Sequence, residues 1–235
     1  DEFYKRLAQS TNLPTTSQVS IHAFSELFNK LAADHEGILC IVLSSGISGT
    51  LDSAESALQE FDSVPVKLVD TRTTACGEAL AVMTAARALE DGLGLEETGK
   101  LVEDFCQKMS TTFVVDTLEY LHKGGRIGGA SRYLGTALNI KPILALDSEG
   151  KIEALERVRT KKKALDRLIT LAEEQVGGGS ASVGVMHASS PKEAQDFLDQ
   201  IQLRINCSQT MIVELSPVIG THVGPGTIGL SVYAD

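Results

Sequence analysis

The sequence lacks tryptophan and is poor in other aromatic residues, which make up 5% of its 235 residues. Bases and sugars commonly stack on aromatic rings, so this scarcity favours an aliphatic ligand over a base or a sugar. The chain also lacks an excess of positive charge, since 21 Lys and Arg face 31 Asp and Glu for a formal net charge of -10. Nucleic-acid binding needs a basic surface that displaces counterions, so the composition argues against a nucleic-acid partner.

Long apolar runs and paired cysteines are missing as well. No run approaches the roughly 18 apolar residues of a membrane-spanning helix, and the start shows no secretory signal pattern. The four cysteines, Cys40, Cys76, Cys106 and Cys207, are scattered without a CxxC pair. This spacing indicates unbridged thiols in a reducing compartment and predicts a cytoplasmic protein. The chain opens on the helical pattern "DEFYKRLAQS" without a leading strand, so we expect that a first segment is missing.

Strand and helix patterns alternate over the first part of the chain. The buried-strand pattern "ILCIVL" precedes a helical pattern from Thr50, and "VKLVD" precedes a long one over 78–92. This alternation is typical of an open α/β sheet. Beyond about residue 110 the pattern changes, and "KPILALD" and "KIEALERVRT" form a predicted hairpin around "SEG". We therefore predict two domains, 1–110 and 111–235.

A later helix carries a start signal of its own. In "SSPKEAQDFL", Ser190 is the expected N-cap, Pro191 takes the first helical position and Glu193 completes a capping box.

The segment "LSSGISGT", from Leu43 to Thr50, joins a predicted parallel strand to a helix. Ligands of open α/β folds bind at the carboxyl ends of such strands. The backbone N–H groups of residues 48 to 50 also lie at the positive end of the helix dipole, which suits an anion. The alternative is that Ser48 and Thr50 only cap the helix.

Several glycine-rich segments partly match known catalytic and phosphate-binding patterns. "GISGT" has Thr50 where the nucleophile elbow GxSxG needs glycine, and no spacing identifies an acid for a His222 base. "GPGTIG" (224–229) matches GxGxxG but is not followed by a helix. "KGGRIGG" (123–129) lacks the ending of a P-loop, yet its Arg126 suits a carboxylate or a phosphate. With "PTTSQ" (14–18) and "THVGPG" (221–226), these segments are expected to converge on one anion.

Six motifs together carry a family resemblance: "LPTTSQVS", "SSGISGT", "VVDTLEYLHKGGRIGG", "NIKPIL", "VRTKKKAL" and "THVGPGTIG". In this order and spacing they resemble the DegV family of bacterial fatty-acid-binding proteins, which includes the binding subunits of fatty acid kinase. The resemblance covers almost the whole chain, although family members begin with a further strand and an Asp-Ser loop. It implies a two-domain α/β fold with an N-terminal parallel α/β/α sheet and a C-terminal domain with a mixed sheet. It also implies one long-chain fatty acid, such as palmitate, enclosed in an apolar tunnel between the domains.

The resemblance also assigns the site. It implies that Thr16 and Ser48 hold the fatty-acid carboxylate, that His222 is a third partner and that Arg126 lies nearby. A neighbouring carboxylate favours the charged form of a histidine, so we expect His222 to be charged beside the fatty-acid carboxylate. Ser17, Ser45 and Gly49 complete the predicted set. Of the other histidines, His22, His35 and His122 show no metal spacing, and His187 is a further candidate for the pocket wall.

By the same resemblance, the protein is not an enzyme and uses no catalytic residue, metal or cofactor. It presents the carboxylate to an ATP-dependent fatty acid kinase, which makes an acyl phosphate for phospholipid synthesis. Transient contact with a membrane surface is compatible with this role. The alternatives are a lipid carrier without a kinase partner and a serine hydrolase.

A cluster of basic residues stands out in this acidic chain and is the predicted kinase-docking rim. It consists of Arg126, Arg132, Arg157, Arg159 and Lys161 to Lys163. Such a local cluster can steer an acidic partner. The alternative is a solvated helix start.

Overall fold

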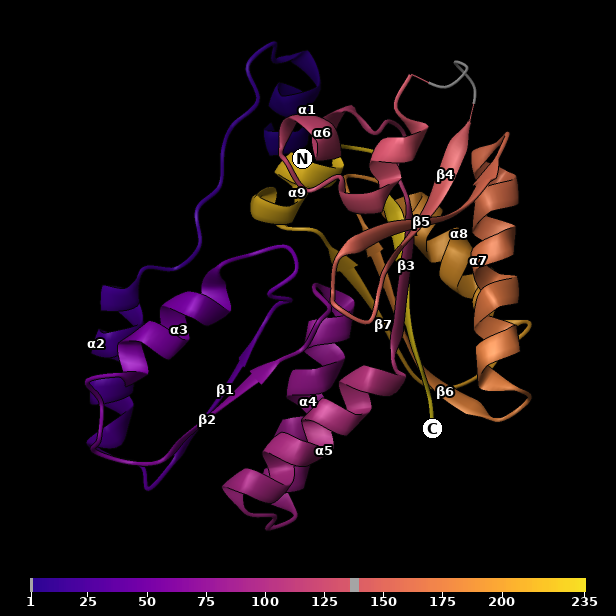
Figure 1. Cartoon of the computed structure of the whole chain (residues 1–235). Coiled ribbons are helices and arrows are strands. Elements are labelled where there is room, and N and C mark those ends of the chain that lie inside the picture. The colour runs from indigo at the N-terminus through magenta and orange to yellow at the C-terminus, as the bar shows by residue number, and fades with distance from the viewer. Residues whose placement is uncertain (1, 136–139) are drawn as a thin grey trace. The chain divides into compact units, whose positions relative to one another are not determined.

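A computed structural model describes residues 2–135 and 140–235 of the chain (Figure 1). The contacts divide these residues into two compact units. The larger unit holds the residues up to Thr16, Met109–Asp147 and Lys151–Asp235, and the smaller unit holds Ser17–Lys108 and Ser148–Gly150. The chain thus passes between units at Lys108, close to the predicted change near residue 110, while its first 16 residues group with the larger unit. The domain bounds 1–110 and 111–235 stay a prediction.

The smaller unit is built around a two-stranded parallel sheet. Its elements are α2 (Ile21–Ala32), β1 (Ile38–Val42), α3 (Thr50–Leu58), β2 (Val66–Asp70), α4 (Cys76–Glu90) and α5 (Leu95–Lys108). The register runs from Ile38 opposite Val66 to Val42 opposite Asp70, so both strands end at the same edge. Phe28 is 1% exposed, and its ring centroid lies 5.7 Å from that of Phe24. Both rings lie on α2, and the Phe61 ring, 5.8 Å from that of Phe28, packs them against the rest of the core.

The larger unit contains a six-stranded mixed sheet in the order β5-β4-β3-β8-β6-β7. Only the β6–β7 pair among these is parallel. Its elements are α1 (Glu2–Gln9), β3 (Ser110–Val114), α6 (Glu119–Lys123), the 3-10 helix η1 (Gly128–Tyr133), β4 (Lys141–Leu146), β5 (Ile152–Val158), α7 (Lys161–Val176), β6 (Ser180–His187), α8 (Pro191–Gln202), β7 (Asn206–Glu214), α9 (Pro217–Val223) and β8 (Ile228–Ala234). The helices α7 and α8 bury Leu168 and Ile201 in one core with Val185 and Leu230 of the sheet.

The predicted fold class is confirmed, because a small parallel sheet and a larger mixed sheet are both present. The hairpin predicted around "SEG" is confirmed as well: β4 and β5 pair antiparallel, and the Asp147 N–H donates to the Lys151 carbonyl at 2.9 Å. The capping box at α8 is wrong. Ser190 makes no side-chain cap there, and the Glu193 carboxylate instead binds the Lys161 ammonium at 2.7 Å.

Two sequence motifs extend beyond the described residues. The opening pattern "DEFYKRLAQS" begins at Asp1, and the motif "NIKPIL" begins at Asn139; neither residue is described. Among the described residues, no helix combines the length and the apolar character that crossing a bilayer requires.

Glu78, in the first turn of α4, gives a testable consequence of burial. Burial raises the pKa of this carboxyl from an ordinary 4.5 to about 7. The folded state therefore holds a proton that the unfolded state releases, and stability falls as the pH rises from 4.5 to about 7. Glu78→Gln removes the charge and is expected to raise the free energy of unfolding at pH 8 by about 2 kcal/mol, a value discounted for partial solvent access. Urea denaturation at pH 8 and at pH 4.5 measures the difference.

The matched control is Glu90→Gln on the same helix, where the side chain is exposed. It should change stability little at either pH. Equal stability of Glu78→Gln and the wild type at pH 8 would contradict the burial argument.

Candidate functional site

Two predicted site residues meet in the larger unit. The Thr16 hydroxyl lies 2.7 Å from Nε2 of His222, although 206 positions separate them in the sequence. Thr16 precedes the "SQ" of "TTSQ", and His222 lies on α9. Both side chains are partly buried, so the pair is shielded from bulk water without being closed to a ligand.

The surroundings of His222 determine its protonation. Its Nδ1 is buried and has no hydrogen-bond partner among the described residues. Gly124 lies against this atom, because a Cβ added there would stand 2.3 Å from Nδ1. Burial first, and then the positive charge of Arg126, lower the pKa of His222 below its ordinary value. The lowered pKa favours the neutral ring near pH 7. The charged imidazole expected beside a carboxylate stays a prediction.

A neutral imidazole carries one proton, and the hydrogen bonds place it. If the proton sat on Nδ1, the protein would bury an unpaired N–H donor, which is rare in proteins. The proton is therefore assigned to Nε2, which donates to the Thr16 oxygen. The hydroxyl proton of Thr16 then remains available for an acceptor.

Arg126 occupies the loop that follows α6. Its side chain is exposed and donates from Nη1 to the Gly124 carbonyl at 2.9 Å. This bond ties the guanidinium to the same loop that contacts His222. Arg126 is thereby placed within electrostatic reach of the Thr16–His222 pair.

In the smaller unit, the segment Leu43–Thr50 joins β1 to α3 and is called here the serine loop. The Ser48 and Thr50 hydroxyl oxygens lie 2.8 Å apart, and the Thr50 N–H donates to the Ser48 oxygen at 3.3 Å. No side chain caps α3, whose N-cap is Gly49, so the Ser48–Thr50 contact is a local hydrogen bond and not the helix cap considered as the alternative. If the Thr50 hydroxyl donates to the Ser48 oxygen, the hydroxyl proton of Ser48 is still available to a further acceptor. Gly49 precedes the first turn of α3, and a Cβ there would stand 3.3 Å from Nε2 of Gln18.

Ser45, a predicted carboxylate-binding residue, is hydrogen-bonded to Asp70. Its hydroxyl donates to Oδ2 of Asp70 at 2.6 Å, and its N–H donates to Oδ1 at 3.2 Å. The single hydroxyl proton is thus used, and the Asp70 charge would repel a second carboxylate. Asp70 was missed in the sequence, although it ends β2 beside the end of β1 and so stood at the predicted edge. Ser17, the remaining predicted residue, is exposed.

The other histidines and the cysteines show no metal site. Within residues 2–135 and 140–235, no group of three or more His, Cys, Asp or Glu is placed to bind a metal ion. The four cysteines all lie in the described residues and form no disulfide there. His187 is 5% exposed and accepts a hydrogen bond from the Ser190 N–H at 3.3 Å, which gives it a structural role.

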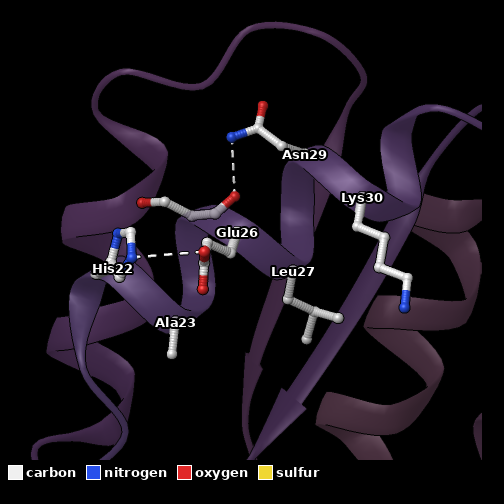
Figure 2. Close-up of a pocket in the computed structure, with 7 residues that line it drawn as sticks. His22, Ala23, Glu26, Leu27, Asn29 and Lys30 are labelled. Atoms are coloured by element: carbon white, nitrogen blue, oxygen red, sulfur yellow. Dashed lines mark hydrogen bonds and ion pairs between the residues drawn. The ribbon is translucent and has the colours of Figure 1, made fainter.

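A shallow hollow lies on the outer face of α2 (Figure 2). It is lined by His22, Ala23, Ser25, Glu26, Leu27, Asn29 and Lys30. His22 faces Glu26 at 3.5 Å across one helical turn, as the dashed line in Figure 2 marks. None of the predicted carboxylate-binding residues lines this hollow. All of its lining residues come from α2, so this hollow does not enclose an acyl chain.

The predicted docking rim separates into paired and exposed cations. Arg132 binds Glu153 at 2.7 Å, and Lys161 binds Glu193 at 2.7 Å. The exposed members Arg157, Arg159, Lys162 and Lys163 lie at the end of β5 and the start of α7. The first turn of α7 contains no acidic residue, although a helix N-terminus favours negative charge. The helix gains nothing from these cations, which favours an external role for them.

Tyr133 makes cation–π contacts with two of these arginines. The guanidinium carbons of Arg132 and Arg157 lie 5.3 Å and 5.9 Å from the centroid of its ring. Such cation–π contacts hold the side chains over the ring. No sequence motif pointed to Tyr133.

The lowered pKa of His222 predicts an acid-sensitive fold. Because the unfolded imidazole binds a proton near 6.5 and the folded one binds it only at lower pH, stability is present above pH 6.5 and is lost as the pH falls below it. His222→Gln should reduce the slope of the free energy of unfolding against pH in this range. One histidine contributes at most about 1.4 kcal/mol per pH unit to that slope. Urea denaturation at pH 5, 6 and 7 measures it.

His187 contributes in the same direction, since burial lowers its pKa as well. The exposed His35→Gln is the matched control and should keep the wild-type slope. If His222→Gln also keeps that slope, the imidazole is not neutral in the folded protein.

Comparisons with known proteins agree with this architecture. A family model described as "Uncharacterised protein, DegV family" matches residues 1–235. A DegV domain-containing protein of Streptomyces coelicolor is 37% identical over 220 residues, which are 93% of this chain and 78% of the relative. Another, from Halalkalibacterium halodurans, is 36% identical over 236 residues, covering 100% of this chain and 83% of the relative.

Solved structures give the same result. A DegV family protein from Thermus thermophilus, described for its fatty acid binding, superposes with a TM-score of 0.92 at 34% identity, covering 100% of this chain and 84% of that one. DegV from Bacillus subtilis, described as a fatty acid binding protein, superposes with a TM-score of 0.87 at 30% identity, covering 99% of this chain and 83% of that one.

Proposed function

Because this chain belongs to the DegV family, we propose that it binds one long-chain fatty acid and presents the carboxylate to a separate ATP-dependent kinase. The observation that carries the binding proposal is the Thr16–His222 hydrogen bond. It leaves the Thr16 hydroxyl as a donor whose orientation is fixed by a neutral imidazole. A hydroxyl donor of this kind fits a carboxylate oxygen.

Further donors are proposed in the serine loop. The Ser48 hydroxyl and the Gly49 N–H stand at the start of α3, where the helix dipole favours an anion. Arg126 adds a positive charge near His222. In this proposal the polar groups fix the head group, while an apolar tunnel for the tail supplies most of the affinity. At about 0.8 kcal/mol per methylene, the tail of palmitate gains roughly 11 kcal/mol before the costs of ordering.

The phosphoryl transfer itself is assigned to the partner. A carboxylate oxygen of the bound lipid attacks the γ-phosphorus of ATP, ADP leaves, and an acyl phosphate for phospholipid synthesis forms. The protein contributes the orientation of the carboxylate and a surface on which the kinase docks. That it needs no cofactor, works in the cytoplasm and contacts a membrane surface only transiently stays a prediction.

The two alternative functions differ in what they require. A serine hydrolase needs a histidine base beside its serine, but the observed partner of the Ser48 hydroxyl is Thr50. A carrier without a kinase needs the same lipid site and differs only in its partner. We therefore favour lipid binding and leave the choice between carrier and kinase subunit to experiment.

The test is extraction of the purified protein with organic solvent, followed by mass spectrometry. We expect one fatty acid per chain, no ester hydrolysis, and acyl-phosphate formation when a fatty acid kinase and ATP are added. A protein that carries no lipid and binds none on titration would refute the binding proposal. Lipid binding without kinase-dependent turnover would leave the carrier.

A further inference from the structure

Residues Ser148–Gly150, between β4 and β5, are called here the hairpin tip, and they pack against the serine loop. We propose that the hairpin tip positions the serine loop for the ligand carboxylate, with Ser44 as the residue that joins them. This inference rests on the proposed function. It adds residues that do not touch the ligand and act through the loop.

Ser44 is the centre of the loop's hydrogen bonds. It is 0% exposed, and its hydroxyl donates to the Gly150 carbonyl at 2.7 Å while accepting from the Gly46 N–H at 3.0 Å. Its carbonyl accepts from the N–H groups of Ile47 and Ser48 at 3.3 Å and 3.2 Å. Its own N–H donates to the Thr73 carbonyl at 2.8 Å. Every polar group of Ser44 thus shapes the loop or binds the tip.

The contact between tip and loop leaves no room for side chains. A Cβ on Gly46 would stand 2.6 Å from the carbonyl carbon of Gly150. A Cβ on Gly150 would stand 1.9 Å from the Ser44 oxygen, and Gly150 also has a φ of 70° that disfavours other residues. The two backbones therefore meet directly, and the position of one fixes that of the other.

A second bond holds the tip from the end of β2. Arg72 donates from Nη1 to the Ser148 carbonyl at 2.7 Å. The Arg72 N–H donates to Asp70 at 3.0 Å, and the same carboxylate binds Ser45. Arg72 has a φ of 51°, which is uncommon for a residue other than glycine. Hydrogen bonds thus join the tip, the end of β2 and the serine loop to one another.

This arrangement determines which donors the loop has left for an anion. The N–H groups of residues 45 to 48 are used by Asp70 and Ser44. The Ser48 hydroxyl and the Gly49 N–H remain in the proposed role. Loss of the Ser44–Gly150 bond frees the loop backbone, so these two donors lose their fixed position.

The experiment compares dodecanoate with dodecan-1-ol, which has a similar tail but no carboxylate. Isothermal titration calorimetry gives both dissociation constants for the wild type, Ser44→Ala and Gly150→Ala. We expect Ser44→Ala to weaken dodecanoate binding about tenfold, the loss of roughly one hydrogen bond to a charged group, and to leave dodecan-1-ol within twofold. Ser148→Ala is the matched control, since Arg72 binds only the backbone carbonyl there.

The ratio of the dissociation constants for dodecanoate and dodecan-1-ol separates a loss of positioning from damage to the fold. Equal loss of both ligands in Ser44→Ala, or wild-type binding of both, would overturn the proposal. If Gly150→Ala does not fold, Ser44→Ala and Arg72→Gln decide. A wild type that binds neither ligand would instead refute the proposed function.

Discussion

Replacing Thr16 with valine is expected to weaken fatty-acid binding by about ten- to a hundredfold, since the lost hydrogen bond to a charged group is worth about 1.5–3 kcal/mol. Valine keeps the shape of threonine and removes only the hydroxyl that His222 orients. Ser48→Ala is expected to act in the same direction, and the double variant should lose at least a hundredfold. Equilibrium titration with a fatty acid measures the change.

The fold should survive these substitutions. Thr16 lies outside the helices and strands, and Ser48 lies in a loop. Thr15→Val is the matched control, because Thr15 is the sequence neighbour of Thr16 and its side chain is exposed. Wild-type lipid occupancy in a folded Thr16→Val, Ser48→Ala protein would remove both hydroxyls from the site.

Reversing Arg157 and Arg159 to glutamate is expected to lower kinase-coupled turnover at least tenfold at low ionic strength, while bound lipid stays intact. Both side chains are exposed, Arg157 at the end of β5 and Arg159 just after it, and Arg157 also lies over the Tyr133 ring. Charge complementarity of this kind mainly raises association rates and is screened beyond about 8 Å at physiological salt. Turnover measured with kinase and ATP across a salt titration tests it.

A general charge effect needs its own control. Lys30→Glu with Lys100→Glu makes the same change in net charge at exposed sites on α2 and α5. This control should retain turnover. If the Arg157 and Arg159 reversal also retains full turnover at every salt concentration, the docking surface lies elsewhere and the cluster is a solvated helix start.

The sequence by itself determined the local structure. The run "ILCIVL" became β1, the turn "SEG" closed the β4–β5 hairpin, and α3 begins at Thr50. These features depend on apolar periodicity and on turn residues, which act over a few neighbouring positions. The motifs also identified the family, because their order and spacing can be read along the chain without knowing which residues are in contact.

The tertiary structure alone decided which groups each polar side chain meets. Ser45, a predicted ligand-binding residue, donates to Asp70. Glu193 was expected to cap its own helix and instead binds Lys161. The neutral state of His222 likewise depends on Gly124 and Arg126, about a hundred residues away. Hydrogen bonds and charges are satisfied by whatever the strand order brings near, and periodicity does not encode that order. The protonation of His222 and the partners of Ser44 could therefore be known only from the fold.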